Sequence, residues 1–197
     1  YKAYEVSTIF IGGGTPTAVP AEWIAYVMES IRQNYSLQEK AEINMEMNPG
    51  TVDRDKLKSY QKAGINRLSI GLQSACDAEL KKLGRIHTFA QFLKTYEDAR
   101  EVGFTNVNVD IMSALPGQSV DSFQETLKAL MHLNPVPEHI SAYSLIIEEG
   151  TPFYTLWEQE KLALPDEDSE RQMYDLTEDV LSANGFHRYE ISNYAKA

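Results

Sequence analysis

The chain opens with two hydrophobic patterns that predict a strand followed by a helix. Residues 8–11 are β-branched or aromatic, as in a buried strand. The apolar residues between 23 and 31 recur on one face of a helix. Pro16 and Pro20 oppose an earlier helical start, and Pro20 suits a first turn, so the helix is predicted to begin at Ala21.

The same order of strand and helix repeats along the rest of the chain. Gly64, Gly103 and Gly185 each stand where a left-handed cap ends a helix, shortly before the next strand pattern. Helices are predicted at about 53–63, 88–102 and 168–183, with one more between Gly117 and Pro135. Strands are predicted at about 7–11, 42–47, 66–71, 106–112 and 139–145, with a last strand near 188–191.

Alternating strands and helices of this length predict an α/β fold with parallel strands, either a barrel or a doubly wound sheet. Polar or glycine residues end five successive strands, which favours a barrel, because a barrel site collects residues from many strand ends. These residues are Gly13, Gly14, Thr15, Glu46, Asn48, Gln73, Ser74, Asp110, Ser113, Tyr143 and Ser144.

Three consecutive glycines, Gly12 to Gly14, separate the first strand from its helix. Glycine has no Cβ and tolerates positive φ, so this run could press backbone N–H groups against a charged ligand. A tight turn between strand and helix explains the same residues without a ligand. From the residues alone, both interpretations stay open.

Composition indicates a soluble, globular chain. The 197 residues are 43% hydrophobic, enough to bury a core within a single domain over 1–197. A net charge of −11 opposes binding to a phosphate backbone, so no nucleic-acid partner is predicted. No apolar run approaches the roughly 20 residues that span a bilayer, so no membrane insertion is expected. Cys76 is the only cysteine, which agrees with a reducing, cytoplasmic location.

Five ordered motifs resemble one known family. They are Gly-Gly-Gly-Thr-Pro at 12–16, Glu-Met-Asn-Pro-Gly at 46–50, Gly-Leu-Gln-Ser at 71–74, Asp-Ile-Met at 110–112 with Leu-Pro-Gly-Gln at 115–118, and Arg-Tyr-Glu-Ile-Ser-Asn-Tyr at 188–194. The family is that of the radical S-adenosylmethionine proteins related to oxygen-independent coproporphyrinogen III oxidase. The stretches 149–153 and 188–194 look like its haem-chaperone branch.

This resemblance implies a partial, TIM-like barrel of about six βα units, in which our chain begins at the second strand. The strand at 7–11 would then be an exposed edge. The family's cluster loop, with three cysteines spaced CxxxCxxC, belongs before residue 12, where this sequence has no cysteine. The branch's haem-binding segment belongs beyond residue 197. We therefore expect the core of a longer protein, with the ligands of its 4Fe–4S cluster outside these residues.

The resemblance assigns four residues to S-adenosylmethionine, three of them to its methionine half. Gly13, Gly14 and Thr15 would offer N–H groups and a hydroxyl to its amino and carboxylate ends. Glu46 would accept hydrogen bonds from its ammonium group or its ribose hydroxyls. The alternative for Glu46 is an ordinary surface carboxylate.

Four more residues resemble positions that contact a second S-adenosylmethionine molecule in the oxidase. They are Gln73, Arg85, Asp110 and, more weakly, Ser144. Arg85 can bind a carboxylate through two parallel hydrogen bonds, as recognition of an aminocarboxylate demands. An ion pair with Asp110 or Glu46 is the alternative for Arg85.

No catalytic or metal-binding residue is predicted within the chain. The four histidines, at 87, 132, 139 and 187, share no metal-ligand spacing and are expected at the surface or as capping residues. Cys76 is expected as a small buried side chain near a helix start. One cysteine cannot hold an iron–sulfur cluster, so the chain alone is expected to be inactive.

Two functions follow from the resemblance. In the first, the full protein is a haem chaperone that passes haem to an acceptor protein. In the second, it is a coproporphyrinogen III dehydrogenase, in which a radical removes a hydrogen from each propionate that is decarboxylated. A third interpretation does not use the resemblance: an iron-free barrel that binds a phosphorylated metabolite at Gly12 to Gly14.

Overall fold

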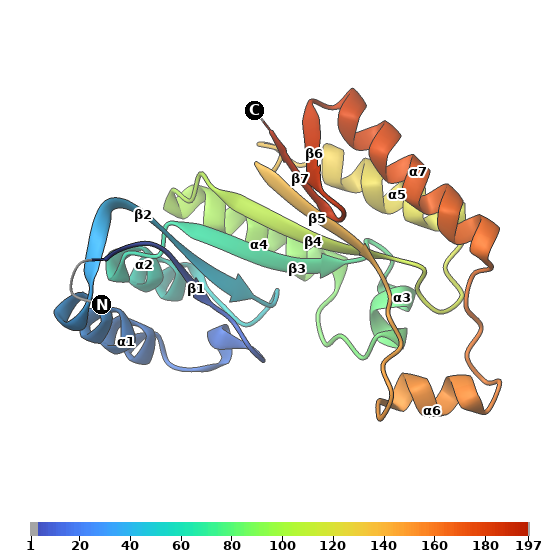
Figure 1. Cartoon of the computed structure of the whole chain (residues 1–197), viewed down its shortest axis with the longest axis horizontal. Helices are drawn as coiled ribbons and strands as arrows, with labels where there is room; N and C mark the ends of the chain where they lie inside the picture. Colours follow the sequence, from blue (N-terminus) through green and yellow to red (C-terminus); the bar gives the residue numbers. More distant parts are fainter. Residues whose placement is uncertain (1–3, 197) are drawn as a thin grey trace. The chain divides into compact units, whose positions relative to one another are not determined.

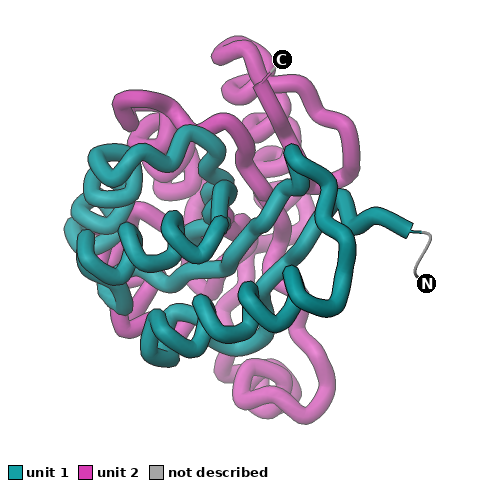
Figure 2. Tube along the Cα trace, turned by 90° about the vertical axis from the view of Figure 1, so that its left-hand side faces the viewer, with its two compact units in different colours: residues 1–72, 90–109 teal, residues 73–89, 110–197 magenta. Residues whose placement is uncertain are grey.

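The structure is a computed structural model and describes residues 4–196. Its backbone groups into two compact units, which Figure 2 shows in different colours. Unit 1 contains the described residues up to Leu72 together with Ala90–Val109. Unit 2 contains Gln73–Phe89 and the described residues from Asp110 onward. The prediction of a single domain over 1–197 stays a prediction.

Unit 1 is built on parallel strands. β1 (Glu5–Ile11), β2 (Ser36–Met47) and β3 (Arg67–Gln73) are neighbours in that order, and β4 (Val107–Ser113) follows β3 (Figure 1). Gln73 at the end of β3 and the second half of β4, from Asp110, belong to unit 2. The pairs β1–β2 and β2–β3 are both parallel, as the sequence predicts. β1 lies at the edge of the sheet, which confirms the predicted edge strand.

Three helices complete unit 1 at nearly the predicted positions. They are α1 (Ala21–Asn34), α2 (Arg54–Ala63) and α4 (Phe89–Val102, of which all but Phe89 is in unit 1). Asp53 caps the start of α2 with its side chain, and Gly64 ends the helix in the left-handed conformation, with φ of 98°. These local signals explain why the limits of α2 were predictable.

The second half of β2 and the first half of β3 alternate polar and apolar side chains. On β2 the residues Ile43, Met45 and Met47 are buried, and on β3 so are Leu68 and Ile70. The residues between them are Glu42, Asn44 and Glu46 on β2 and Arg67 and Ser69 on β3. Since successive strand residues point to opposite faces, one face of the sheet is apolar and the other is polar. The polar face leads directly to the strand ends where the site is predicted.

Unit 2 adds two strands near the end of the chain whose antiparallel pairing the sequence analysis did not predict. Its strand order is β4, β5 (His139–Ser144), β7 (Asn193–Lys196) and β6 (Phe186–Glu190). The pairs β5–β7 and β6–β7 are antiparallel, so the sheet is mixed and the last predicted strand is the first half of a hairpin. The turn between β6 and β7 contains no glycine, so the usual sequence signal for a tight hairpin is missing.

Two long helices of unit 2 match the prediction, and three shorter elements do not. α5 (Val120–Met131) and α7 (Glu167–Ala183) pack against each other. The sequence analysis did not predict the 3₁₀ turn Pro16–Ala18 in unit 1 or α6 (Pro152–Glu158) in unit 2. For α3 (Asp77–Lys82) it expected only a helix start near Cys76, with no range. Pro16 starts the 3₁₀ turn that we expected it to prevent, because proline suits a first turn position. Elements this short show too little periodicity to be recognised.

β2 is also longer than predicted and begins at Ser36 rather than near 42. Residues 36–40 are mostly polar, so they lack a strand pattern, and they pair with β1 across an irregularity in the register.

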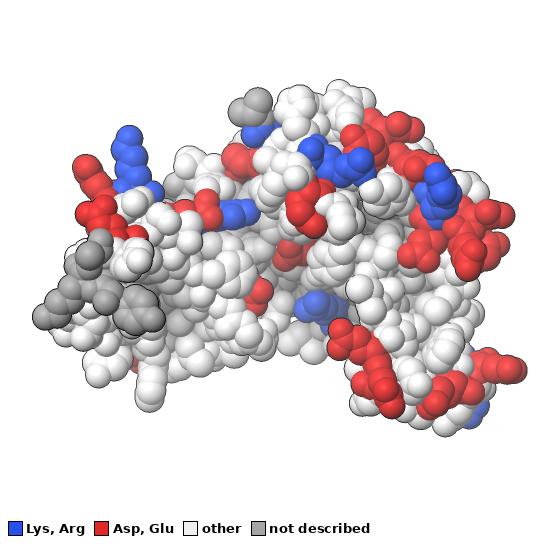
Figure 3. Space-filling model, in the orientation of Figure 1, with Lys and Arg blue, Asp and Glu red and all other residues white. Residues whose placement is uncertain are grey.

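Acidic side chains gather over α7, where Glu167, Asp168 and Glu170 occupy the first turn (Figure 3). In the described part of the chain, no helix combines the length and the hydropathy that a bilayer crossing requires.

Candidate functional site

The glycine run in unit 1 forms an open loop directly beside Glu46. The register pairs Ile11 of β1 with Met45 of β2, so Gly12 and Glu46 come next on their strands. The N–H of Gly13 donates to Oε2 of Glu46 at 3.1 Å. Gly13 and Gly14 have φ of +87° and +67°, and a Cβ at either would meet no atom of the described chain within 4 Å. Only glycine takes this backbone without strain.

Gly12 has a different role from the two glycines after it. A Cβ at Gly12 would lie 2.9 Å from Cδ of Glu46 and 2.5 Å from Cε1 of Phe10. Gly12 therefore allows the strand end to approach the carboxylate of Glu46. The sequence analysis included Gly12 in the run but gave it no role of its own.

Thr15 lies close to the end of β2. Its Oγ1 accepts a hydrogen bond from Nδ2 of Asn48 at 2.9 Å. This contact leaves the hydroxyl proton of Thr15 able to donate to an anionic group. The predicted residues Gly13, Gly14, Thr15 and Glu46 are thus brought together in unit 1, and Asn48 joins them.

The polar face of unit 1 carries residues that sequence analysis did not assign. Nη1 of Arg67 lies 2.9 Å from Oε1 of Glu42, and Nδ2 of Asn108 donates to Oγ of Ser69 at 2.6 Å. The Oδ1 atom of Asn44 is buried without a hydrogen-bond partner among residues 4–196. The alternation of polar and apolar residues from 41 to 47 is the signal that could have located this face.

In unit 2, Gln73 is held at the end of β3 in an unusual conformation. Its residue is 3% exposed and its φ is +68°. Oη of Tyr143, on β5, donates to Oε1 of Gln73 at 3.2 Å. Tyr143 was noted as a strand-end residue but not assigned to the site, and the structure places it against Gln73.

Ser144 lies on the opposite side of β5 from Tyr143, because successive strand residues alternate. Its Oγ is 3.1 Å from Oγ of Ser113. Ser144 also lines a cavity of about 410 Å³ with residues of α7, among them Arg171 and Tyr174. Gln73 therefore meets Tyr143 rather than Ser144.

Arg85 and Asp110 are both half-buried. Arg85 follows α3, and its backbone N–H donates to the carbonyl of Leu80 at 2.9 Å. Asp110 lies in β4 two residues after Asn108, so both belong to the same, polar side of that strand.

Two of the four histidines depart from the expectation of surface or capping positions. His87 and His139 are 4% and 8% exposed, and Nε2 of His139 is 2.7 Å from Oη of Tyr189. His132 caps α5 as expected, with Nδ1 2.7 Å from the carbonyl of Lys128.

Cys76 precedes α3 as expected but is half-exposed rather than buried. The described residues contain no group of histidine, cysteine and acidic side chains arranged for a metal ion.

The 188–194 motif forms the hairpin of β6 and β7. Glu190 accepts hydrogen bonds from the N–H of Ser192 at 3.2 Å and from Nδ2 of Asn193 at 2.7 Å. These bonds lower the pKa of the Glu190 carboxyl below its usual value. Oγ of Ser141 donates to Oδ1 of Asn193 at 2.9 Å, which ties the hairpin to β5. The geometry of this motif is that of a structural turn.

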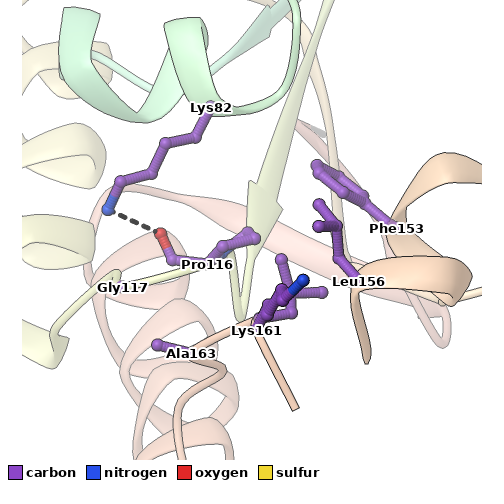
Figure 4. Close-up of a pocket in the computed structure, with 8 residues that line it drawn as sticks. Lys82, Pro116, Gly117, Phe153, Leu156, Lys161 and Ala163 are labelled. Atoms are coloured by element: carbon purple, nitrogen blue, oxygen red, sulfur yellow. Dashed lines mark hydrogen bonds between the residues drawn. The ribbon is translucent and has the colours of Figure 1, made fainter. Parts of the chain in front are cut away.

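A further cavity of about 310 Å³ in unit 2 contains none of the predicted site residues (Figure 4). Nζ of Lys82 donates to the carbonyl of Pro116 at 3.0 Å on one side of it, and Phe153 and Leu156 of α6 lie on the other. A Cβ on Gly117 would lie 2.5 Å from Nζ of Lys82, so the flexible end of this lysine would have to move. This cavity therefore lies outside the candidate cofactor site.

Comparison with protein families defines the class of this protein. The family model of the radical SAM superfamily matches residues 1–130, about two thirds of the chain. The chain belongs to the radical SAM superfamily.

Individual relatives are more specific. The heme chaperone HemW of Bacillus subtilis is 40% identical over 98% of this chain and 51% of its own length. The zebrafish protein named radical S-adenosyl methionine domain-containing protein 1, mitochondrial, is 40% identical over 97% of this chain and 43% of its own length. The chain thus spans about half the length of the curated relatives it matches.

The solved structure of coproporphyrinogen III oxidase (HemN) from Escherichia coli matches with a TM-score of 0.85 at 29% identity. The match covers 98% of this chain and 44% of the HemN chain. It confirms the predicted α/β fold as that of the partial radical SAM barrel.

Proposed function

We propose that this chain is the S-adenosylmethionine-binding core of a HemW-like haem chaperone. The observation that carries the proposal is the open loop of Gly13 and Gly14 beside Glu46. Two exposed glycines with positive φ leave space that a side chain would fill, the N–H of Gly13 donates to the carboxylate of Glu46, and the hydroxyl of Thr15 follows in the same loop. This donor and acceptor set suits a ligand that carries both an ammonium and a carboxylate group.

The residues have separate roles in this proposal. Gly13, Gly14 and Thr15 would bind the amino and carboxylate ends of the cofactor, while Glu46 accepts from its ammonium or ribose hydroxyls. In unit 2, Gln73, Arg85 and Asp110 would contact a second cofactor molecule. Ser144, the fourth residue that the resemblance suggests, lies on the other side of β5 from the contact of Tyr143 with Gln73 and is left out of this set. S-adenosylmethionine supplies one-electron chemistry when it is bound with a reduced iron–sulfur cluster. The single cysteine does not fit the three thiolates that such a cluster needs, so no step is assigned to a cluster held by these residues.

A second function is favoured by the match to HemN, whose 29% identity and TM-score of 0.85 cover nearly the whole chain. In that case the full protein would oxidatively decarboxylate coproporphyrinogen III. The full-length protein with its cluster can be incubated anaerobically with S-adenosylmethionine and coproporphyrinogen III. Haem binding without decarboxylated product supports the chaperone, whereas protoporphyrinogen formation supports the oxidase.

The cofactor site is tested by Gly14→Val in the full-length protein with its cluster. We expect calorimetric titration to show S-adenosylmethionine affinity reduced at least a hundredfold, because the new side chain occupies the ligand's space and disfavours φ of +67°. Gly185→Val is the matched control: its φ is +81°, and its Cβ also meets no atom of the described chain within 4 Å. The control should show similar strain, of order 1–3 kcal/mol, and normal affinity. Normal affinity in Gly14→Val would contradict the assignment.

A further inference from the structure

Two residues other than glycine hold a left-handed backbone at the ends of adjacent strands. Gln73 is the last residue of β3, with φ of 68°, and Ala114 directly follows β4, with φ of 58°. Such a conformation costs on the order of 1–3 kcal/mol per residue and persists only where the surroundings hold it. Strain of this kind gathers at functional sites, so its support identifies residues that shape the site.

The hydrogen bonds that hold the left-handed backbone at Gln73 begin at the next residue. Ser74 is fully buried, and its Oγ donates to Oε2 of Glu79 at 2.6 Å while accepting from the N–H of Cys76 at 2.9 Å. The N–H of Ala75 donates to Oγ1 of Thr126 at 3.1 Å. The chain after Gln73 is therefore fixed by a side chain that itself depends on Glu79.

The support of Ala114 leads to the same carboxylate. The N–H of Leu115 donates to Oε1 of Gln118 at 3.2 Å, and Nε2 of Gln118 donates to Oε2 of Glu79 at 2.9 Å. The other oxygen, Oε1, accepts from the hydroxyl of Ser122 on α5. Glu79 is 4% exposed, and within the described residues its partners are these three neutral donors.

We propose that Glu79 is a positioning residue of the cofactor site, which holds the strained ends of β3 and β4 through one carboxylate oxygen. The proposal rests on the proposed function, because it matters only if Gln73 contacts S-adenosylmethionine. Ser74 and Gln118 connect Glu79 to the strand ends, and Tyr143 fixes the carbonyl end of the Gln73 side chain. The amide end of Gln73 is thereby directed for donation to a ligand.

The test compares two serines that donate to the same carboxylate, in the full-length protein with its cluster. Ser74→Ala breaks the connection to Gln73, whereas Ser122→Ala breaks only the contact with α5. We expect Ser74→Ala to weaken S-adenosylmethionine binding about tenfold by calorimetry, and Ser122→Ala to leave it within about twofold, since one positioned hydrogen bond corresponds to about a factor of ten. Equal effects of the two variants on affinity would overturn the proposal.

Glu79 itself is tested by a conservative pair. Glu79→Gln keeps one oxygen for Ser74 and Gln118, and the hydroxyl of Ser122 can turn to accept from the new amide, so affinity should be near that of the wild type. Glu79→Met has similar size but no such acceptor, and its affinity should fall at least tenfold. A Glu79→Gln variant as weak as Glu79→Met would contradict the positioning role. If Glu79→Met does not fold, the comparison of Ser74→Ala with Ser122→Ala tests the positioning role instead.

A double-mutant cycle shows whether the effect passes through Gln73. In the Gln73→Ala background, Ser74→Ala should cause no further loss of affinity. If Ser74→Ala acted through a general loss of structure instead, the affinity of the double variant would fall below that of Gln73→Ala. If the wild type binds no S-adenosylmethionine, the proposed function fails, and with it the role of Glu79. If Gln73→Ala weakens binding and Ser74→Ala does not, only the role of Glu79 fails.

Discussion

Two carboxylates are buried in the described chain, one in each unit, and they are stabilised in different ways. Asp98 of unit 1 is 5% exposed and pairs with two cations, Arg54 with Nε at 2.5 Å and Lys94. Glu79 of unit 2 is 4% exposed and accepts from two hydroxyls and an amide. Both satisfy the rule that a buried polar group needs hydrogen bonds, but only Asp98 is paired with cations.

The difference shows what each arrangement can do. The cations on Asp98 are side chains with exposed fractions of 49% for Arg54 and 62% for Lys94, so water can replace the carboxylate as their partner. Two of the donors on Glu79, Ser74 and Gln118, are buried and cannot turn to water, while Ser122 is half-buried. An ion pair of this kind links helices with little demand on geometry, whereas the Glu79 network fixes the atoms attached to its donors.

The largest expected effect is on folding of the 197-residue chain with Glu79→Met. Three buried or half-buried donors lose their acceptor, so the free energy of unfolding should fall by about 3–5 kcal/mol. Glu79→Gln should stay within about 1 kcal/mol of the wild type, because its donors keep or reverse their hydrogen bonds. Urea unfolding measures both. If Glu79→Met lost little stability, the donors to Glu79 would have other partners, and the network would not fix their positions.

Asp98→Asn should have a smaller effect, of about 1–2 kcal/mol at neutral pH, because Arg54 and Lys94 regain hydration. Arg54 also contacts Glu101, with Nη2 at 2.5 Å from Oε2, and that contact remains in the variant. A loss as large as that of Glu79→Met would remove the contrast between the two units.

The pH dependence gives Asp98 a signature of its own. Burial alone would raise the pKa of this carboxyl, but hydrogen bonds from Lys94 and Arg54 outweigh burial and hold the pKa below its ordinary value of 3.8. A folded-state pKa below the unfolded value stabilises the protein above pH 3.8 and loses this contribution as the pH falls through the folded pKa. The stability difference between wild type and Asp98→Asn should therefore shrink below about pH 4 in urea titrations. A stability difference that grows on acidification would mean that folding raises the pKa of Asp98 rather than lowering it.

Salt should produce the smallest effect. Raising sodium chloride from about 0.05 to 0.5 M screens exposed ion pairs, so the difference between wild type and Asp98→Asn should shrink by less than about 1 kcal/mol. The difference between wild type and Glu79→Gln should not change, since neutral donors surround that carboxylate. Matched urea curves at both salt concentrations measure this. Equal salt dependence at the two sites would indicate a cation near Glu79.

The amino-acid sequence by itself determined the order of most elements and the motif residues of the candidate site. Periodicity located the long helices, and capping residues such as Asp53 and Gly64 set the limits of α2. The glycine run indicated a backbone with positive φ, and Gly13 and Gly14 adopt this conformation, which only glycine takes easily. These features depend on neighbours within a few residues, so they can be read locally.

Tertiary structure alone decided which polar residues are buried and which meet. Glu79 stands in Asp-Ala-Glu-Leu-Lys-Lys, a charged segment that looks like an exposed helix, yet its partners Gln118 and Ser122 are 39 and 43 residues away. The burial of His139 and the antiparallel return of β7 depend equally on distant segments. Propensity and periodicity act over one or two turns of chain, whereas the cost of burying a polar group is decided by partners that only the folded chain brings near.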